Sequence, residues 1–199
     1  MRRVPRLAPR PALYLGLGQV FFAAMVVCCW LIKPSHKALK VGLSYYGTQL
    51  ETAGALVLGC VGCVALTALA LTAVRSRAPW FRRLRLGVGV VLVLMMAIPL
   101  TPYSIDIVVD WLHIGIASTL FAVAYALGGW IAFRVRCTPF TLLLLLGQST
   151  AAFWAAAAEL GVVGWMLPSQ MVFELTFAAL VAIAVALAAT VDGEAAPVW

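Results

Sequence analysis

Long apolar runs separated by short polar segments dominate the pattern of this chain. Six runs have the length and composition of membrane-spanning helices, at about residues 11–32, 51–74, 86–103, 108–133, 139–159 and 169–191. A helix needs about 20 apolar residues to cross roughly 30 Å of hydrocarbon. The pattern therefore predicts an all-α fold, a polytopic membrane protein with six transmembrane helices in a single bundle.

The composition agrees with a membrane environment. Of the 199 residues, 64% are hydrophobic and 11% are charged, whereas soluble domains average about 45–50% apolar and about 25% charged residues. Six spans and their loops occupy nearly the whole chain, which leaves no room for a separate catalytic domain. We therefore expect any activity to lie within the helices or their short loops.

Positive charge is concentrated between the apolar runs. The N-terminus, the loop after residue 74 and the loop after residue 133 hold four, five and two Lys or Arg residues, and the first loop holds three. Cytoplasmic segments carry the excess of Lys and Arg. The sequence thus predicts a cytoplasmic-membrane protein with a basic cytoplasmic N-terminus (1–11), a transmembrane domain (12–191) and a cytoplasmic tail (192–199). The net charge of +7 reflects topology, and we expect no nucleic-acid partner.

Four of the predicted helices carry a stripe of small residues that begins or ends with an acid. Residues three or four apart lie on one side of a helix. The stripes are Glu51, Ala55, Gly59 and Cys63; Asp106, Asp110, His113 and Ala117; Gln148, Ala152, Ala155 and Glu159; and Glu174, Ala178, Ala182 and Ala186. Small residues let helices approach closely in a membrane, so we expect these faces to point into the bundle.

The acidic ends of the stripes predict a polar pocket near the extracytoplasmic side. Its candidate residues are Glu51, Asp106, Asp110, His113, Glu159 and Glu174, with Tyr46 and Gln170 as polar neighbours. An ionisable side chain inside a membrane is costly and marks a functional site by default. One interpretation is a pocket for a cation, a lipid head group or a protonatable substrate. The other is that the acids cap helix ends and form hydrogen bonds at the wet interface.

Two patterns resemble metal or redox motifs. Asp110 and His113 have ligand-like spacing, but a metal site needs three or four ligands, and only carboxylates remain to complete one. Cys60 and Cys63 have the spacing of a redox pair, yet they lie deep in an apolar run, where we expect them to be small packing residues. The sequence predicts no metal and no cofactor, and no serine or cysteine with its base and orienting group can be assembled from it.

Two segments resemble a known family. Residues 42–48 (Gly-Leu-Ser-Tyr-Tyr-Gly-Thr) lead into the second run, and residues 98–99 (Ile-Pro) precede a short turn before Asp110 and His113. Together with helix number and order, they resemble the bacterial domain-of-unknown-function family 998, over about residues 12–190. That family is similar to the eukaryotic damage-regulated autophagy modulators, and the resemblance implies a role in membrane-lipid organisation or regulation rather than catalysis.

The sequence leaves three functional hypotheses. The first is a non-enzymatic integral membrane protein that binds membrane lipids or accompanies another membrane protein. The second is a small proton- or cation-coupled transporter that uses Asp110, His113 and Glu174. The third is an intramembrane metal-dependent hydrolase that uses the same residues.

Overall fold

The structure, a computed structural model, describes residues 11–102 and 106–194, with side chains as far as Thr190. Its long helices are α1 (Pro11–Ile32), α4 (Leu50–Ala73), α5 (Pro79–Ala97), α6 (Ile107–Trp130), α7 (Pro139–Glu159) and α8 (Met166–Glu194). Shorter elements are α2 (His36–Val41), α3 (Leu43–Gly47), the 3-10 turn η1 (Ile98–Leu100) and the π-helical turn η2 (Ile131–Val135). These described residues contain no strand, which confirms the all-α class.

Five helices are long and apolar enough to cross a membrane. They are α1, α4, α6 continued through η2, α7 and α8. The bounds of α1 and α7 coincide with the predicted runs, and α4 differs by one residue at each end. α8 begins at Met166 rather than at about residue 169. The prediction of a multi-pass helical membrane protein is confirmed for these five runs by length and composition.

The third predicted run differs from the structure at both ends. α5 begins at Pro79 rather than at about residue 86, and proline at the first helical position has its backbone already set for a helix. The second half of the basic segment therefore forms the first turns of α5, whereas Arg75 and Arg77 lie in the link before it. Arg85 donates a hydrogen bond to the Val74 carbonyl, and its guanidinium carbon lies 4.6 Å from the centroid of the Phe81 ring. α5 ends at Ala97, and η1 follows it with Pro99 at its second position.

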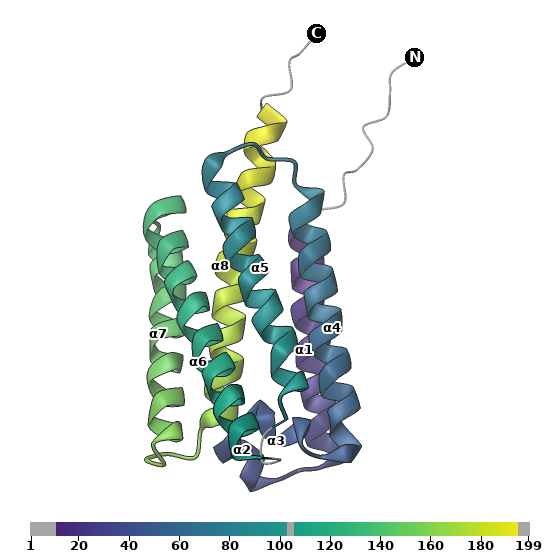
Figure 1. Ribbon diagram of the computed structural model, residues 1–199. Coiled ribbons are helices and arrows are strands. Elements are labelled where there is room, and N and C mark those ends of the chain that lie inside the picture. Colours follow the sequence, from purple (N-terminus) through teal and green to yellow (C-terminus); the bar gives the residue numbers. More distant parts are fainter. Residues whose placement is uncertain (1–10, 103–105, 195–199) are drawn as a thin grey trace.

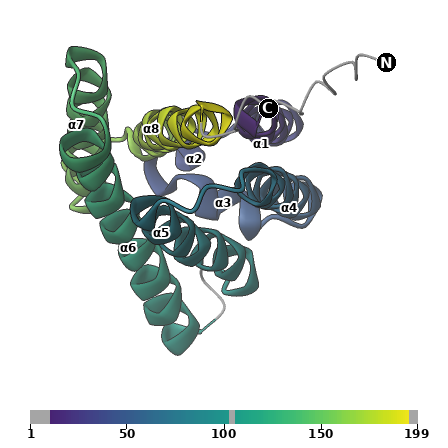
Figure 2. The same ribbon diagram turned by 90° about the horizontal axis from the view of Figure 1, so that it is seen from above.

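The helices lie roughly parallel along the bundle (Figure 1). The start of α1, the link from α4 to α5 and the end of α8 share one end, here named the terminal end, and α2 and α3 lie at the other, the α2–α3 end. In the view from above, α8 lies between α1 and α7, and α5 lies beside α6 (Figure 2). The most extensive packing is between α1 and α4 and between α7 and α8. Most of the predicted segments 1–11 and 192–199 lies outside the described residues.

The half of the bundle near the terminal end has an apolar core. Its fully buried members include Phe81, Leu84, Val88, Ile131 and Leu180. A second cluster, which includes Phe22, Cys29, Tyr46, Leu56 and Cys63, lies towards the α2–α3 end. The polar groups described below lie beside this second cluster.

Glycine allows α1 and α4 to pack closely. A Cβ added at Gly18 would lie 3.4 Å from the Cys63 carbonyl oxygen, and one added at Gly59 would lie 2.9 Å from the Met25 Cβ. Gly59 and Cys63 belong to the predicted stripe of α4, and both are buried. The stripe of α8 fits less well, because Ala178 is buried but Ala186 is exposed.

Candidate functional site

The segment between α2 and α4 packs against α8 and is joined to it by a partly buried hydrogen bond. Gly42 has a φ of +82°, a conformation that favours glycine, and it separates α2 from α3. The Leu43 N–H donates to Gln170 Oε1 over 2.8 Å. A Cβ at position 42 would come within 2.7 Å of Met166 Cγ. This close fit fixes the position of the next residue, Ser44, relative to α8.

His113 joins three elements near the α2–α3 end. It is 4% exposed. Its Nδ1 lies 2.5 Å from the carbonyl oxygen of Thr101, and its Nε2 lies 2.7 Å from Ser44 Oγ. A carbonyl oxygen only accepts, so Nδ1 carries a proton and donates to Thr101; in the neutral tautomer that this contact favours, Nε2 is an acceptor. In that tautomer the Ser44 hydroxyl donates to His113 Nε2.

A cavity of about 90 Å³ lies between α1, α4, α5, α6 and α8. This volume has room for about three water-sized groups. Its walls are mainly apolar and include Phe22, Leu56, Val91, Met95, Phe121 and Phe173. The polar side chains in its lining are Ser44, Gln170 and Glu174, with the thiol of Cys60. Two predicted site residues, Gln170 and Glu174, thus come together in one cavity.

Glu174 faces this cavity with little to neutralise it. Its Oε1 accepts a hydrogen bond from Gln19 Nε2 over 3.3 Å, and the same nitrogen lies 3.4 Å from Cys63 Sγ. Within the described part of the chain, no Lys, Arg or His side chain forms an ion pair with Glu174. The Oε1 atom of Gln19 is buried and accepts no hydrogen bond from a described residue. An ionised carboxylate in such surroundings costs free energy unless a counter-charge lies beside it or a proton neutralises it.

The four other predicted acids lie at or near helix ends and do not line the cavity. Glu51 lies in the first turn of α4, where its side chain is 59% exposed and pairs with Lys33 over 3.3 Å. Asp106 caps α6 by accepting from the Val108 N–H over 2.7 Å. Glu159 is the exposed last residue of α7. Asp110 lies half-buried in the first turn of α6, one turn before His113.

Tyr46 is an anchoring residue rather than part of the cavity lining. It is 0% exposed and belongs to the same cluster as Phe22 and Leu56. Its hydroxyl finds no hydrogen-bond partner among the described residues. Burial raises the pKa of the Tyr46 hydroxyl, and Cys29 and Tyr45 raise it further.

The cysteines and metal-ligating residues form no centre in the described parts of the chain. All five cysteines are free, and Cys60 and Cys63 are buried in α4. No group of three His, Cys, Asp or Glu side chains gathers at one point in residues 11–102 and 106–190. The polar groups in the cavity lining are a hydroxyl, an amide, a carboxyl group and a thiol.

A larger groove, of about 880 Å³, lies between α7 and α8. Its lining includes Leu143, Leu146, Trp154, Trp165 and Val172, most of which are exposed on the outside of the bundle. It contains no titratable side chain. We take the smaller cavity as the candidate site, because the groove has hydroxyl groups but nothing that carries charge.

Sequence reasoning missed Gln19, Ser44 and Thr101. Gln19 is a single amide in an apolar run, and Ser44 lies in a segment that was expected to be a polar loop. Ser44 meets His113 only because α3 packs beside the start of α6, which no local pattern indicates. A comparison of the chain with protein-family models, with curated proteins and with solved structures found no match.

Proposed function

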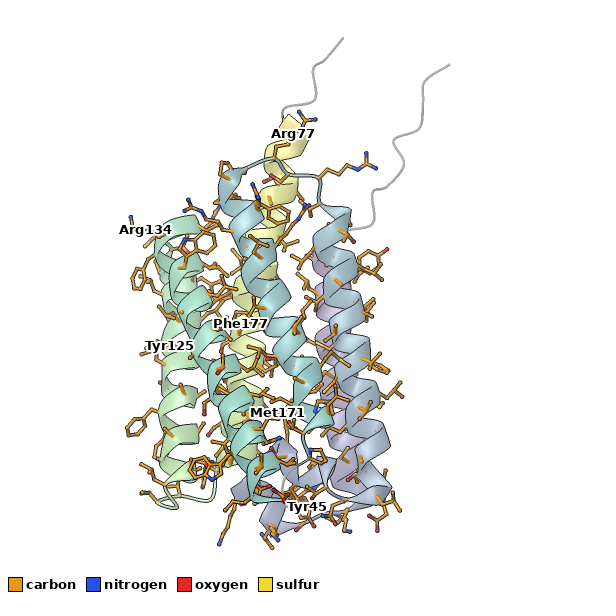
Figure 3. All side chains as sticks on the ribbon, viewed as in Figure 1. Tyr45, Arg77, Tyr125, Arg134, Met171 and Phe177 are labelled. Atoms are coloured by element: carbon orange, nitrogen blue, oxygen red, sulfur yellow. The ribbon has the colours of Figure 1, made fainter. Side chains whose placement is uncertain are left out.

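We propose that the chain crosses the cytoplasmic membrane six times, with both termini in the cytoplasm. The sixth span is α5, whose 19 residues reach about 28 Å. Its three arginines lie in the first turns, where long basic side chains extend to the head groups. Arg77 and Arg134 both lie at the terminal end, and Tyr45 lies at the opposite end (Figure 3). The excess of basic residues at the terminal end supports a cytoplasmic location for that end.

Within this architecture, we propose that the protein binds a primary ammonium group in the cavity at Glu174. The group belongs to a lipid head group or to a free amine. The observation that carries the proposal is the carboxyl group of Glu174 in a mostly apolar cavity, with no cation from the described residues beside it. An ionisable residue within a span is rare and is functional by default.

An ammonium group matches the acceptors better than a divalent metal does. It has three N–H donors. Glu174 lines the cavity and offers carboxylate oxygens. Gln19 lies behind this lining, donates to Glu174, and has a buried Oε1 atom that lacks a partner among the described residues. Ca²⁺ takes six to eight oxygen ligands and Mg²⁺ takes six, which is more than these residues supply. The volume of about 90 Å³ also suits a small group rather than a whole lipid.

The transport hypothesis has less support. A carrier needs a path from the cavity to the cytoplasmic side. Between the cavity and the terminal end lie the fully buried apolar residues Leu84, Val88 and Leu180. The metal-dependent hydrolase has no group of three ligands among the described residues. Membership of family 998 stays a prediction.

We also propose membrane lipids as partners on the outside of the bundle. The groove between α7 and α8 is apolar, and both helices are long enough to cross the membrane. In a bilayer, such a groove suits an acyl chain. Large side chains such as Leu143, Trp154 and Trp165 line it, whereas helix pairs in membranes associate through small residues.

A titration tests the ammonium site. The protein is placed in phosphatidylglycerol nanodiscs, and its unfolding temperature is measured against added ethylamine hydrochloride. We expect a rise that depends on ethylamine concentration in the wild type and in Glu51→Gln, and no such rise in Glu174→Gln. A second set of nanodiscs that contain phosphatidylethanolamine separates the two sources, because a lipid head group in the cavity would abolish the response to ethylamine. Equal responses of wild type and Glu174→Gln would refute the proposal.

A further inference from the structure

The hydrogen bonds around His113 form a chain with a direction. The Thr101 carbonyl accepts from Nδ1, and in the neutral tautomer Nε2 accepts from the Ser44 hydroxyl. The distances are 2.5 Å and 2.7 Å, and the ring is almost fully buried. A serine hydrogen-bonded to an imidazole that a third group orients is the arrangement of an activated nucleophile. Here a backbone carbonyl takes the place of the carboxylate.

Ser44 also lines the cavity, so its hydroxyl lies where a ligand can reach it. Gln170 lines the same cavity, and its Oε1 is held by the Leu43 N–H, next to Ser44 in the chain. Because Oε1 of Gln170 is engaged by the Leu43 N–H, the other polar group of this side chain is the Nε2 amide, a hydrogen-bond donor suited to a carbonyl oxygen that binds beside Ser44. The rest of the lining is mainly apolar, and surroundings of low polarity strengthen such a hydrogen bond.

We propose that Ser44 is the nucleophile of an acyl-transfer site, with His113 as its general base and Gln170 as the donor to the carbonyl oxygen. The substrate class is a carboxylic ester of an amphiphile with a short acyl group. The ester reaches Ser44 from the α2–α3 end, where α3 lies outside the predicted spans. The limit on acyl length follows from the cavity volume of about 90 Å³.

The reaction balances with water as the second substrate. Ser44 Oγ bonds to the carbonyl carbon while His113 Nε2 takes the hydroxyl proton. The bond from that carbon to the ester oxygen then breaks, and His113 returns the proton to the leaving alcohol. Water attacks the acyl-serine with His113 again as base, which releases the carboxylic acid and restores Ser44. No oxidant, reductant or metal is required.

The proposed acyl-transfer activity goes beyond ammonium binding. Its test can fail independently of the ethylamine titration, because it detects a covalent label on Ser44. The experiment treats purified protein in nanodiscs with a fluorophosphonate, which forms a Ser–O–P bond and releases fluoride. We expect the label on Ser44, located by peptide mass spectrometry, and no label on heat-denatured protein. We also expect hydrolysis of p-nitrophenyl acetate to be faster than that of p-nitrophenyl decanoate.

Three variants separate catalysis from packing. His113→Asn keeps an N–H donor for the Thr101 carbonyl but lacks the base, and we expect labelling to slow at least about 100-fold. Gln170→Glu keeps the acceptor for the Leu43 N–H but loses the donor, and we expect hydrolysis to fall about 100-fold or more. Ser149→Ala is the matched control, because the Ser149 hydroxyl contacts the Tyr125 hydroxyl and the Leu145 carbonyl rather than a histidine.

The labelling pattern decides between a catalytic serine and a structural hydrogen bond. An unlabelled wild type, a label on another serine, or His113→Asn labelled at the wild-type rate would each overturn the proposal. Because the first two outcomes concern the wild type, misfolding of a variant cannot obscure them.

Discussion

The Nε2 atom of Gln19 on α1 lies 3.3 Å from Oε1 of Glu174 on α8, and this hydrogen bond crosses the interface of the two helices. The same nitrogen also approaches Cys63 on α4. The hydrogen bond leaves Gln19 Oε1 without a donor among the described residues and leaves Glu174 without a counter-charge there. This incomplete pairing is the basis of the proposed binding site.

The first prediction concerns the stability of this pair. In Glu174→Gln, the new amide can accept from Gln19 Nε2 and donate to Gln19 Oε1, so we expect a gain of about 1 kcal/mol in the free energy of unfolding. Glu174→Leu leaves Gln19 unpaired and should lose about 1–3 kcal/mol. Denaturant unfolding in detergent micelles measures both. Equal losses of unfolding free energy in the two variants would show that Glu174 contributes to stability through packing alone.

The second prediction concerns Tyr46. Because its buried hydroxyl has no partner among the described residues, Tyr46→Phe should leave stability unchanged or raise it slightly. Tyr46→Ala opens a cavity and should cost about 3–5 kcal/mol, as for other large aromatic side chains. Thermal unfolding checks both, with Tyr45→Phe, at a half-buried position, as the control.

Tyr46 also predicts a dependence on alkaline pH. Burial raises the pKa of its hydroxyl in the folded state, so the folded state holds the proton more tightly than the unfolded state. Its contribution to stability is complete below the ordinary tyrosine pKa of about 10 and is lost as pH rises through the raised value. Tyr46→Phe should therefore lose less stability above about pH 10 than the wild type. Parallel unfolding curves for the two proteins over this range would contradict the assignment.

The third prediction concerns the contact between α1 and α4. Gly18→Leu adds a side chain where a Cβ alone would lie 3.4 Å from the Cys63 carbonyl oxygen, and we expect a loss of about 1–3 kcal/mol from overpacking. Gly16→Leu is the matched control, since a Cβ at Gly16 meets nothing within 4 Å. Similar stabilities of the two variants would mean that α1 and α4 do not pack as described.

The fourth prediction concerns orientation. Cys137 is exposed between η2 and α7, at the end proposed to be cytoplasmic. A membrane-impermeant maleimide should label Cys137 only after intact cells are permeabilised. In a Cys137→Ser background, Lys37→Cys on α2 should react without permeabilisation. The reverse pattern would invert the proposed topology, and labelling of both positions in intact cells would exclude six spans.

The helices could be predicted from sequence more closely than the site. Apolar runs of helical length determine α1 and α7 residue for residue, because the bilayer requirement acts on local composition. α5 begins earlier than predicted. Its first turns contain three arginines, which interrupt the apolar pattern from which the helix was predicted. The short helices α2 and α3 were expected as a polar loop, because each is too short to show a periodicity.

For the site, the stripe of the last run identified Glu174, and Gln170 was predicted as a polar neighbour, but the sequence did not indicate what surrounds them. The same pattern included Glu51 and Glu159, and the structure places both at exposed helix ends. A helical repeat in the sequence indicates which side of a helix a residue occupies. It does not indicate which neighbouring helix packs against that side. The partners Gln19 and Ser44 come from other elements, so only the tertiary arrangement reveals them.

The most direct test of the proposed function is a high-resolution density map of the protein purified with saturating ethylamine, compared with a map of Glu174→Gln prepared in the same way. The account predicts density for an amine nitrogen within hydrogen-bond distance of the Glu174 carboxyl group and of Gln19 Oε1 in the wild type, and its loss in the variant. A dry, empty cavity in the wild type, or the same density in both maps, would contradict it.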